Sequence, residues 1–261
     1  ALTQVSRINK VLFEDLQMAK LIQTNILSEE YKIRKNLEFE VLYEPMMEVG
    51  GDIYDIFELS HNYYRIFVAD ATGHGIQAAL TTMIIKGEYD KIKKTEGLPY
   101  IILAIFNNIF TKKYLNLNVF FTCIVMDIDL NRNKILYSTA GQPDQYLLHQ
   151  GKLEVIPGGG KMIGILENMK FLERETAFVP GDKLLLFSDG LFEQFSQGKE
   201  ELGEGRFSQL VENRIQEKIG TLVPHLLEDV KDWIGGGEVN DDICVVGIEY
   251  PPKKKKSIYA S

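Results

Sequence analysis

The sequence predicts an α+β fold in which two antiparallel β-sheets pack face to face and α-helices flank them on the outside. Two observations support this prediction. Most of the strand-like segments come in pairs joined by short turns, which is typical of antiparallel hairpins. Two long helices lie between these sets of strands, whereas a doubly wound parallel fold would need a helix after nearly every strand.

The N-terminal segment, residues 5–27, has the pattern of one amphipathic helix. Apolar residues recur along it every seven positions, at Val5, Leu12, Ala19 and Ile26. This spacing places them on one face, which can pair with a second copy in a coiled coil or pack on the chain's own domain. We therefore assign residues 1–30 to an amphipathic linker helix that could support a homodimer.

The rest of the chain, residues 31–252, has the pattern of a single domain without internal repeats or low-complexity linkers. Apolar runs bounded by turn residues predict its strands, at 37–44, 52–59, 63–70, 119–128, 134–140, 145–149, 152–156, 171–179, 183–189 and 242–250. Apolar residues at helical spacing predict helices, at 75–94, 99–114, 207–219 and 222–234. The remaining segment, 253–261, is a basic C-terminal tail.

Composition and charge bear on the class of function. The 261-residue chain is 45% hydrophobic and 25% charged, as expected of a globular protein with a sizeable core. Its formal net charge of −8 argues against nucleic acid as the main partner, because a phosphate backbone requires a basic surface. Bound metal ions could still provide local positive charge for a phosphorylated substrate.

The chain lacks a run of about 18 or more apolar residues, so we expect no transmembrane segment. Its two cysteines, Cys123 and Cys244, each lie in an apolar run and are predicted to be buried thiols. These features predict a cytoplasmic location. Because the chain begins with Ala1, we expect it to be part of a longer protein, such as the cytoplasmic part of a membrane-attached sensor.

Aspartates stand at the ends of apolar strands in four places, each beside glycine or another acid. They are Asp52 in VGGDIYD, Asp70 in VADATGHG, Asp189 in LLLFSDG, and the pair Asp241 and Asp242 in NDDICVV. A strand end holds a side chain rigidly, and an adjacent glycine leaves room for a metal ion or a substrate. A single acid at a strand end is usually a turn former, but four such places predict a shared site.

A cluster of carboxylates in one pocket requires cations that neutralise it. Ligands that are all oxygen favour magnesium or manganese over zinc or copper. Two such ions can clamp an attacking water and the phosphate oxygens in line, so that no nucleophilic side chain is needed. The sequence has no credible serine or cysteine triad, no GxSxG and no Walker-type loop. His74, between two glycines, is expected to brace its turn rather than act as an acid or a ligand.

Taken together, these segments resemble the SpoIIE/RsbU-type branch of the PPM family, which consists of metal-dependent protein phosphatases of bacteria. The resemblance extends from about Ala19 to Tyr250, and five motifs follow in the family's order: VGGDIYD, VADATGHGIQAAL, YSTAGQPDQYLL, LLLFSDGLFEQ and DDICVVGIEY. It implies an αββα sandwich preceded by a linker helix. It also implies hydrolysis of phosphoserine or phosphothreonine on a protein by a water that two divalent cations, Mn²⁺ or Mg²⁺, activate.

The resemblance further implies roles for individual residues. Asp70 would bridge both metals, and Asp52 would hold one of them together with the backbone carbonyl of Ala71. Asp189 and Asp241 would hold the other metal. Asp242 stays open as an alternative to Asp241, although the family's motif favours the first position of the pair.

The chain departs from the family's usual residues at Thr72, Gln142 and Cys244, none of which is a proposed ligand. Members of this branch often act on phosphorylated antagonists of anti-sigma factors in partner-switching pathways, and they are often fused to sensor domains. The resemblance therefore implies a phosphorylated protein substrate of this kind and an upstream sensor domain.

Two other interpretations remain open. GGDIY resembles the GGDEF signature of nucleotide cyclases that make cyclic diguanylate, although a cyclase would not explain SDG and NDDIC as further acidic strand ends. A catalytically silent regulatory module could also keep the fold and bind a partner without turnover. The loss of an aspartate would mark such a module, and all four places are intact.

Overall fold

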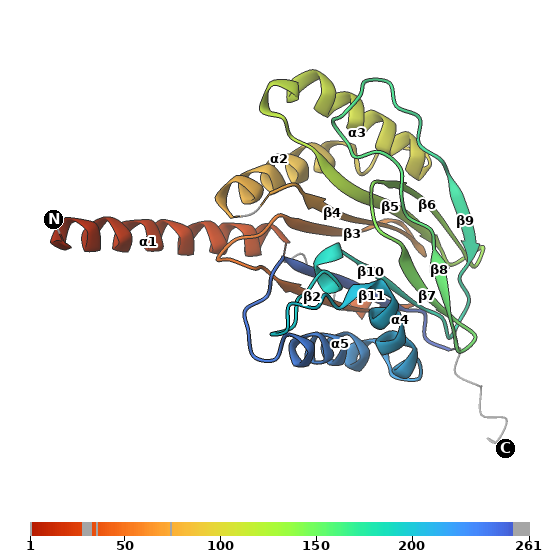
Figure 1. The fold of residues 1–261 in the computed structure, drawn as a ribbon. Helices are drawn as coiled ribbons and strands as arrows, with labels where there is room; N and C mark the ends of the chain where they lie inside the picture. The colour runs from red at the N-terminus through yellow and green to blue at the C-terminus, as the bar shows by residue number, and fades with distance from the viewer. Residues whose placement is uncertain (1, 28–32, 35, 74, 253–261) are drawn as a thin grey trace, which may run out of the picture.

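The computed structural model describes residues 2–27, 33–34, 36–73 and 75–252. The role of His74 and the basic tail, 253–261, therefore lie outside the described residues. The described strands form two sheets that pack face to face between two pairs of helices (Figure 1). This arrangement confirms the predicted αββα sandwich.

The first sheet has six strands and the second has five. In spatial order, the first consists of β1 (Ile33–Arg34), β2 (Leu37–Glu44), β11 (Ile243–Glu249), β10 (Lys183–Phe187), β7 (Gln145–His149) and β8 (Lys152–Ile156). The second consists of β3 (Asp52–Ser60), β4 (Tyr63–Ala71), β5 (Phe121–Asp129), β6 (Lys134–Ala140) and β9 (Arg174–Ala177). Every pairing between these neighbours is antiparallel, as predicted.

Helices cover the outer face of each sheet (Figure 1). Helices α2 (Ile76–Ile92) and α3 (Pro99–Lys113) lie on the five-stranded sheet, while α4 (Gly203–Asn213) and α5 (Ile219–Ile234) lie on the six-stranded sheet. Short 3₁₀ turns follow α3 and β10, namely η1 (Leu115–Leu117) and η2 (Asp189–Leu191). One apolar cluster fills the space between the sheets and beneath α2 and α3, and a second lies beneath α4 and α5.

The outer face of β4 packs on aromatic side chains of the helices. Phe67 stacks on Tyr89 of α2 with ring centroids 4.1 Å apart, and it meets Phe106 of α3 edge to face at 5.8 Å. Successive side chains of a strand alternate between its two faces. Asp70, three residues along the strand, therefore points to the opposite side, toward the other sheet.

The predicted boundaries of the helices near the C-terminus are wrong. The helix predicted at 207–219 is α4, which begins and ends earlier, and α5 begins three residues before the predicted 222. Between the two helices, Arg214 turns back and donates hydrogen bonds of 2.5 and 2.6 Å to Asp229 of α5. This long-range ion pair, which the local sequence does not reveal, turns the connection out of α4.

The strand predicted at 171–179 is also shorter than expected. Only the four residues of β9 pair with the sheet, opposite residues 134–137 of β6. Phe171 is buried in the core instead of continuing the strand.

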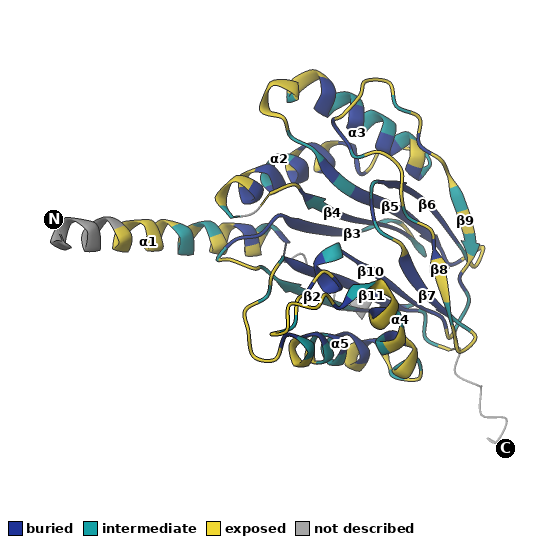
Figure 2. Ribbon diagram, in the orientation of Figure 1, coloured by how far each residue is buried: buried dark blue, intermediate teal, exposed yellow. Residues whose placement is uncertain are grey.

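Helix α1 (Leu2–Leu27) projects from the body of the domain and confirms the predicted N-terminal helix (Figure 1). Its last turns pack on the domain, where Gln23 and Leu27 are each 4% exposed. Farther from the body, over residues 9–22, the helix is largely exposed (Figure 2), including the apolar side chains of Val11, Leu12, Phe13, Met18, Leu21 and Ile22. The domain limits and the cytoplasmic location stay predictions.

None of the described helices combines the length and the hydrophobicity that a membrane-spanning helix needs. Cys123 and Cys244 are buried free cysteines, as predicted.

Candidate active site

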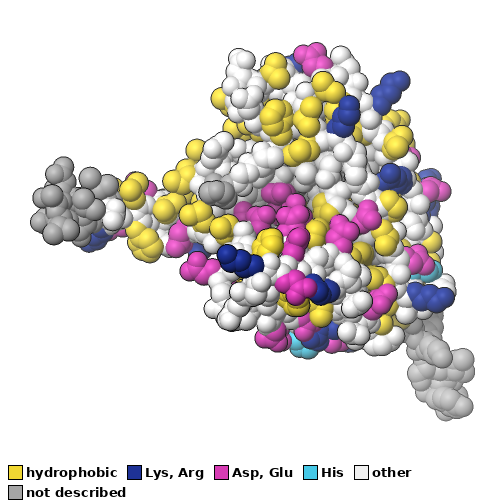
Figure 3. Space-filling view, viewed as in Figure 1, with side chains coloured by type: hydrophobic (Ala, Val, Ile, Leu, Met, Phe, Trp, Pro, Cys, Tyr) yellow, Lys and Arg dark blue, Asp and Glu magenta, His cyan; other side chains and the backbone are white. Residues whose placement is uncertain are grey.

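The predicted aspartates come from both sheets and meet at one edge of the sandwich. Asp52 opens β3 and stands opposite Asp70, near the end of β4, in the strand register. Asp189 begins η2 directly after β10, and Asp241 and Asp242 precede β11, which pairs with β10. Figure 3 shows acidic side chains gathered at the centre of one face, between the two layers.

These acids act on one another electrostatically. Burial and then the charge of Asp70 raise the pKa of Asp52 well above its usual value. Burial, followed by the charges of Asp189, Asp241 and Asp242, raises the pKa of Asp70 to about 8. Burial and the charge of Asp241 also raise the pKa of Asp189. We call the group formed by Asp52, Asp70, Asp189 and Asp241 the acidic centre.

Asp52 is the most deeply buried member of the acidic centre, at 1% exposed. Ser188 donates a hydrogen bond of 2.6 Å to its Oδ2 atom, and the N–H of Cys244 donates one of 3.1 Å to the Ser188 hydroxyl. The Oδ1 atom of Asp52 is buried and accepts no hydrogen bond from a described residue. A buried carboxylate oxygen without a donor is costly unless a cation meets it. The environment of Asp52 therefore suits a cation ligand.

Asp242 has a different environment from its neighbour Asp241. Its Oδ1 atom accepts a hydrogen bond of 2.7 Å from the N–H of Met46, and its Oδ2 atom accepts one of 2.5 Å from the N–H of Gly51. Asp242 is buried, whereas Asp241 is partly exposed, and the charge of Asp241 acts more strongly on Asp70. Both oxygens of Asp242 thus hold the loop before β3.

Gly50 and Gly51 let that loop pass between Asp242 and the end of β4. The N–H of Ala71 donates a hydrogen bond of 3.1 Å to the carbonyl of Gly51. A Cβ atom at Gly51 would lie 2.9 Å from the Ala71 carbonyl oxygen, and one at Gly50 would lie 2.9 Å from Asp242 Cγ. Glycine at both positions thus brings the Ala71 carbonyl, a predicted metal ligand, against the residue that precedes Asp52.

The sequence did not reveal the roles of three polar residues that support the acidic centre. One is Ser188, which binds Asp52. The other two are Gln142 and Gln145, whose amides donate hydrogen bonds of 2.9 and 3.2 Å to the carbonyl of Phe187, at the end of β10. All three lie inside motifs that the sequence presents, LLLFSDGLFEQ and YSTAGQPDQYLL, but their partners are visible only in the fold.

The chemistry of the acidic centre suits hard divalent cations. Its carboxylate and carbonyl oxygens are the ligands that magnesium and manganese prefer. Among the residues that the structure describes, no three His, Cys, Asp or Glu side chains are grouped so that they could hold a metal ion by themselves. Magnesium is commonly bound through one or two carboxylates, with waters and substrate phosphate completing its shell. The residues therefore fit open cation sites rather than a closed protein cage.

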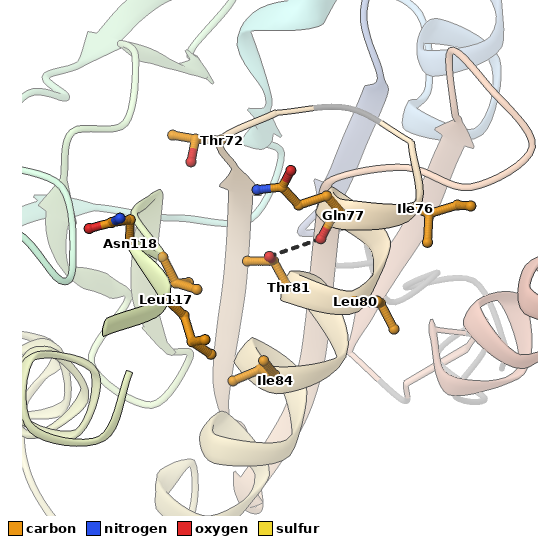
Figure 4. Close-up of a pocket in the computed structure, with 9 residues that line it drawn as sticks. Thr72, Ile76, Gln77, Leu80, Thr81, Ile84, Leu117 and Asn118 are labelled. Atoms are coloured by element: carbon orange, nitrogen blue, oxygen red, sulfur yellow. Dashed lines mark hydrogen bonds between the residues drawn. The ribbon is translucent and has the colours of Figure 1, made fainter. Parts of the chain in front are cut away.

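A groove of about 570 Å³ lies beside the acidic centre. It begins at Thr72, the neighbour of Ala71, and continues between the first half of α2 and the segment after α3. Figure 4 shows Gln77 and Thr81 on the side of α2 that points toward Leu117, across the groove. The lining is mainly apolar, and Leu117 is 58% exposed.

Solved structures with the same fold define the class of domain. The chain is similar to the SiaA-PP2C domain of Pseudomonas aeruginosa, with a TM-score of 0.84 and 22% identity, covering 93% of this chain and 98% of that one. It is also similar to RsbX in complex with magnesium, with a TM-score of 0.60 and 15% identity, covering 83% and 96% of the two chains. The fold is thus that of a PP2C-type domain.

Sequence comparison places the chain within a family. The model of the family described as Stage II sporulation protein E (SpoIIE) matches residues 60–251, more than half of the chain, so the chain belongs to this family. Over 188 residues it is 26% identical to the phosphoserine phosphatase RsbP of Bacillus subtilis (strain 168), covering 69% of this chain and 45% of RsbP. It is 23% identical to the phosphoserine phosphatase RsbU of the same strain, covering 71% of this chain and 56% of RsbU. The chain thus spans about half the length of these relatives.

Proposed function

We propose that this domain hydrolyses phosphoserine or phosphothreonine on a protein, with a metal-activated water as the nucleophile. The acidic centre is the observation that carries this proposal. Strand ends from both sheets bring together carboxylates that repel one another, and the charged groups that act most on Asp70 are all acids. Membership of the SpoIIE family and similarity to proteins named phosphoserine phosphatases support the same chemistry.

Two divalent cations, Mn²⁺ or Mg²⁺, would lower the pKa of the attacking water and offset the negative charge that develops on the phosphoryl oxygens. We assign Asp70 to contact both cations, because it lies opposite Asp52 and the charges of Asp189 and Asp241 raise its pKa. Asp52 and the Ala71 carbonyl would hold one cation, and Asp189 and Asp241 would hold the other. The similarity to a magnesium complex of RsbX supports a divalent metal.

Two further residues would fix the geometry of these ligands. Ser188 binds the Oδ2 atom of Asp52, which would leave the Oδ1 atom to hold a cation. Asp242 holds the N–H of Gly51 and thereby the start of β3. Residues behind the ligands commonly set ligand orientation in metal sites. We therefore favour Asp241 as the ligand of the acidic pair and assign a structural role to Asp242.

The groove beside the acidic centre supports a protein as the substrate. Thr72 connects the groove to Ala71, so a phosphorylated residue at the acidic centre would place its chain neighbours along α2. Exposed apolar side chains such as Leu117 and Leu80 suit apolar residues of a protein, whereas free phosphoserine has none to offer. The resemblance to partner-switching phosphatases makes a phosphorylated anti-sigma factor antagonist the substrate that we propose.

We also propose that α1 connects the domain to an upstream sensor and pairs with the same helix of a second copy. Leu12, on the face with seven-residue spacing, and Ile22, which lies on the same side of the helix, are both exposed and would form part of the seam of such a homodimer. Sedimentation of native protein and of Leu12→Asp tests this pairing. A monomer in both cases at micromolar concentration would rule it out.

The two alternative functions have weaker support. The two glycines before Asp52 are explained by the fold, because Gly50 packs closely against Asp242 and Gly51 against Ala71. The GGD sequence therefore does not require a nucleotide cyclase. A silent regulatory module differs from the proposed enzyme only in turnover.

The proposed function is tested by hydrolysis of a phosphoserine peptide and of p-nitrophenyl phosphate in the presence of Mn²⁺. We expect Mn²⁺-dependent turnover by the native protein and its loss in Asp189→Asn. Asp232→Asn, which changes an exposed acid of α5, serves as the matched control and should stay active. Tight Mn²⁺ binding without turnover would favour the silent module, and formation of cyclic diguanylate from GTP would favour the cyclase.

A further inference from the structure

We propose that a cavity at the edge of the five-stranded sheet binds an acidic side chain of the protein substrate, a few residues away from the phosphorylated one. This inference rests on the proposed function. The cavity has a volume of about 310 Å³ and lies beside β6. Its charged lining residues are all basic, namely Lys161, Lys170 and Arg174, and we call it the basic cavity.

The basic cavity occupies a gap in the pairing along the edge of β6 that faces β9. At one end of the gap, Arg174 of β9 stands opposite Tyr137, the last residue of β6 that β9 covers. At the other end, the N–H of Gly141, just after β6, donates a hydrogen bond of 2.9 Å to the carbonyl of Gly159 in the loop after β8. Thr139 lies between these two stretches and lines the cavity. The gap is therefore built into the edge of the sheet.

The chain does not neutralise the cations of this cavity itself. In the part of the chain that the structure describes, none of the three forms an ion pair with a carboxylate, and the acids around them have other partners. Glu175 pairs with Lys134 at 3.2 Å, and Asp144 accepts a hydrogen bond of 2.7 Å from the N–H of Gly158. Burial raises the pKa of Glu173, and the charge of Lys134 lowers it. Three positive charges thus remain for an external anion, in a chain whose net charge is −8.

Arg174 is already held in place at the cavity. Its Nη1 atom donates hydrogen bonds of 2.6 and 3.0 Å to the carbonyls of Pro157 and Gly158, which attach the loop after β8 to β9. A guanidinium matches the geometry of a carboxylate, and an ordered side chain loses little freedom when it binds one. The lining also includes Thr139 and Phe171, which are 7% and 8% exposed. Partial shielding from water by such residues strengthens the attraction between a carboxylate and the cations.

The strand register gives the separation between the basic cavity and the acidic centre. Val68 on β4, Ile124 on β5 and Thr139 on β6 form one row across the sheet. Asp70 lies two residues beyond Val68 and therefore on the same face. With about 4.8 Å between strands and about 3.4 Å per residue, Thr139 lies about 12 Å from Asp70. An extended peptide advances about 3.3 Å per residue, so a phosphoserine at the acidic centre places a residue about three to five positions away at the basic cavity.

The charges of the molecular surface have the same arrangement. On the face that Figure 3 shows, basic side chains lie beyond the central acids, toward the side where Figure 1 places β6, β8 and β9. The net charge of the chain would repel an acidic peptide, so a preference for one requires local positive charge. The basic cavity provides that charge, and it predicts a substrate with Asp or Glu about three to five residues from the phosphoserine.

The test uses three phosphoserine peptides of equal length. One has Glu at the third to fifth positions before the phosphoserine, one has Glu at the same positions after it, and one has Gln at all of these positions. Hydrolysis in the presence of Mn²⁺ gives kcat and KM for the native protein, for Lys170→Glu and for Lys152→Glu. Lys152 is an exposed lysine of β8 outside the lining of the cavity, so Lys152→Glu is the matched control for a change in net charge.

We expect one of the two Glu peptides to have a KM about three- to tenfold below that of the Gln peptide, as partly exposed charge pairs can produce. Lys170→Glu should remove this difference, while its KM for the Gln peptide and for p-nitrophenyl phosphate should stay within about twofold of native. Lys152→Glu should keep the preference. In about 0.5 M NaCl the preference of the native protein should shrink, because salt screens charge pairs of this kind.

Equal KM values for the three peptides in the native protein would overturn the proposal, as would an equal loss of preference in Lys152→Glu. A native protein that hydrolyses the Gln peptide and shows no preference for Glu would contradict only this inference and leave the proposed function intact. Fluorescence anisotropy of the labelled peptides needs no turnover and makes the same comparison through Kd values if the domain is inactive. Tighter binding of a Glu peptide that Lys170→Glu abolishes would then support the basic cavity, and equal Kd values would overturn it.

Discussion

Buried acids of the five-stranded sheet have two different kinds of surroundings. At the start of β3, the charged groups that act most on Asp52 are other acids. Three residues along the strand, Asp55 is 2% exposed and binds the ammonium groups of Lys86 and Lys93 at 2.8 and 3.0 Å. The chain therefore supplies its own cations to Asp55 but surrounds Asp52 with further negative charge.

Asp127 repeats the pattern of Asp55 on β5. Arg65, on β4, donates hydrogen bonds of 2.7 Å to each of its oxygens, and both side chains are at most 1% exposed. The remaining donors of Arg65 bind the carbonyls of Lys93, Thr95 and Gly97 after α2. A buried ion pair is tolerated when every donor is satisfied in this way.

Buried negative charge thus has two uses in the five-stranded sheet. Where the chain provides matching cations, the acids attach α2 to the sheet and serve the fold. Where it provides only more acids, the negative charge is available for external cations and serves the chemistry.

The largest effect on turnover should come from Asp70→Asn. It should lower kcat/KM by about 10³-fold or more, because charge stabilisation worth several kcal/mol is lost. The same variant, without metal and at neutral pH, should resist urea better than the native protein, since folding no longer has to keep a proton on a carboxyl whose pKa is raised to about 8. Steady-state kinetics with Mn²⁺ and urea unfolding without it measure the two effects. Turnover within about tenfold of native at saturating Mn²⁺ would exclude the assigned role of Asp70.

Asp127→Asn should destabilise the protein, in contrast to Asp70→Asn. It leaves the buried Arg65 guanidinium without its counter-charge, so the free energy of unfolding should fall by about 3–5 kcal/mol. Urea unfolding measures this loss. Glu175→Gln is the matched control, because it removes an exposed partner of Lys134 and should cost less than about 1 kcal/mol. Equal losses in the two variants would show that burial does not distinguish the pairs.

Asp241 and Asp242 are adjacent in sequence, but their substitution should have different effects. Asp241→Asn should weaken Mn²⁺ binding by about 10- to 100-fold while leaving stability close to native. Asp242→Asn should instead lower the free energy of unfolding by about 1–3 kcal/mol, because it weakens the acceptors for the N–H groups of Met46 and Gly51. Titration calorimetry and urea unfolding on both variants decide the assignment, which a reversal of the two results would contradict.

The acidic centre should also give the metal-free protein an unusual pH dependence. The pKa of Asp70 is raised from 3.8 to about 8, so the folded state binds this proton more tightly than the unfolded chain does. As pH rises from about 4 to about 8, the free energy of unfolding should therefore fall, and Mn²⁺ should bind more tightly because it replaces the proton. Urea unfolding across this range, with EDTA or with Mn²⁺, measures both trends. A fall of the same size in native protein and in Asp70→Asn, or a native stability in EDTA that rises with pH, would contradict this origin.

The smallest effect on activity should come from a substitution in the groove. Leu117→Asp should raise the KM for a phosphoserine peptide with apolar flanking residues by several-fold to about tenfold, the value of one apolar contact, with p-nitrophenyl phosphate unaffected. Val155→Asp changes an equally exposed apolar residue on β8 and should leave both substrates unaffected. An equal effect on the two substrates would show that the groove does not contribute to recognition of the peptide.

The sequence predicted the sandwich because its hairpins are short and local. The turn between β3 and β4, for example, is only two residues long, and Asn62 adopts the left-handed conformation there. The acidic strand ends were also visible, since glycine or a second acid accompanies each of them. Features that depend on neighbours in sequence were therefore predictable.

Contacts over long sequence distances were not predictable. Nothing near Asp242 in sequence shows that it binds Gly51, 191 residues away, and nothing on α1 shows that Gln23 binds Gly50. The pair of Arg214 and Asp229, which joins the segment after α4 to α5, likewise connects residues that are not neighbours in sequence. The support around the acidic centre thus comes from tertiary contacts, although its ligands come from local motifs.

The central claim is that the acidic centre binds divalent cations, and calorimetric titration with Mn²⁺ tests it most directly. The native protein and the Asp232→Asn control should bind Mn²⁺ alike, while Asp70→Asn should bind it at least about 100-fold more weakly. A native protein that binds no Mn²⁺, or an Asp70→Asn variant with native affinity, would contradict the claim and make the acidic strand ends a structural feature only.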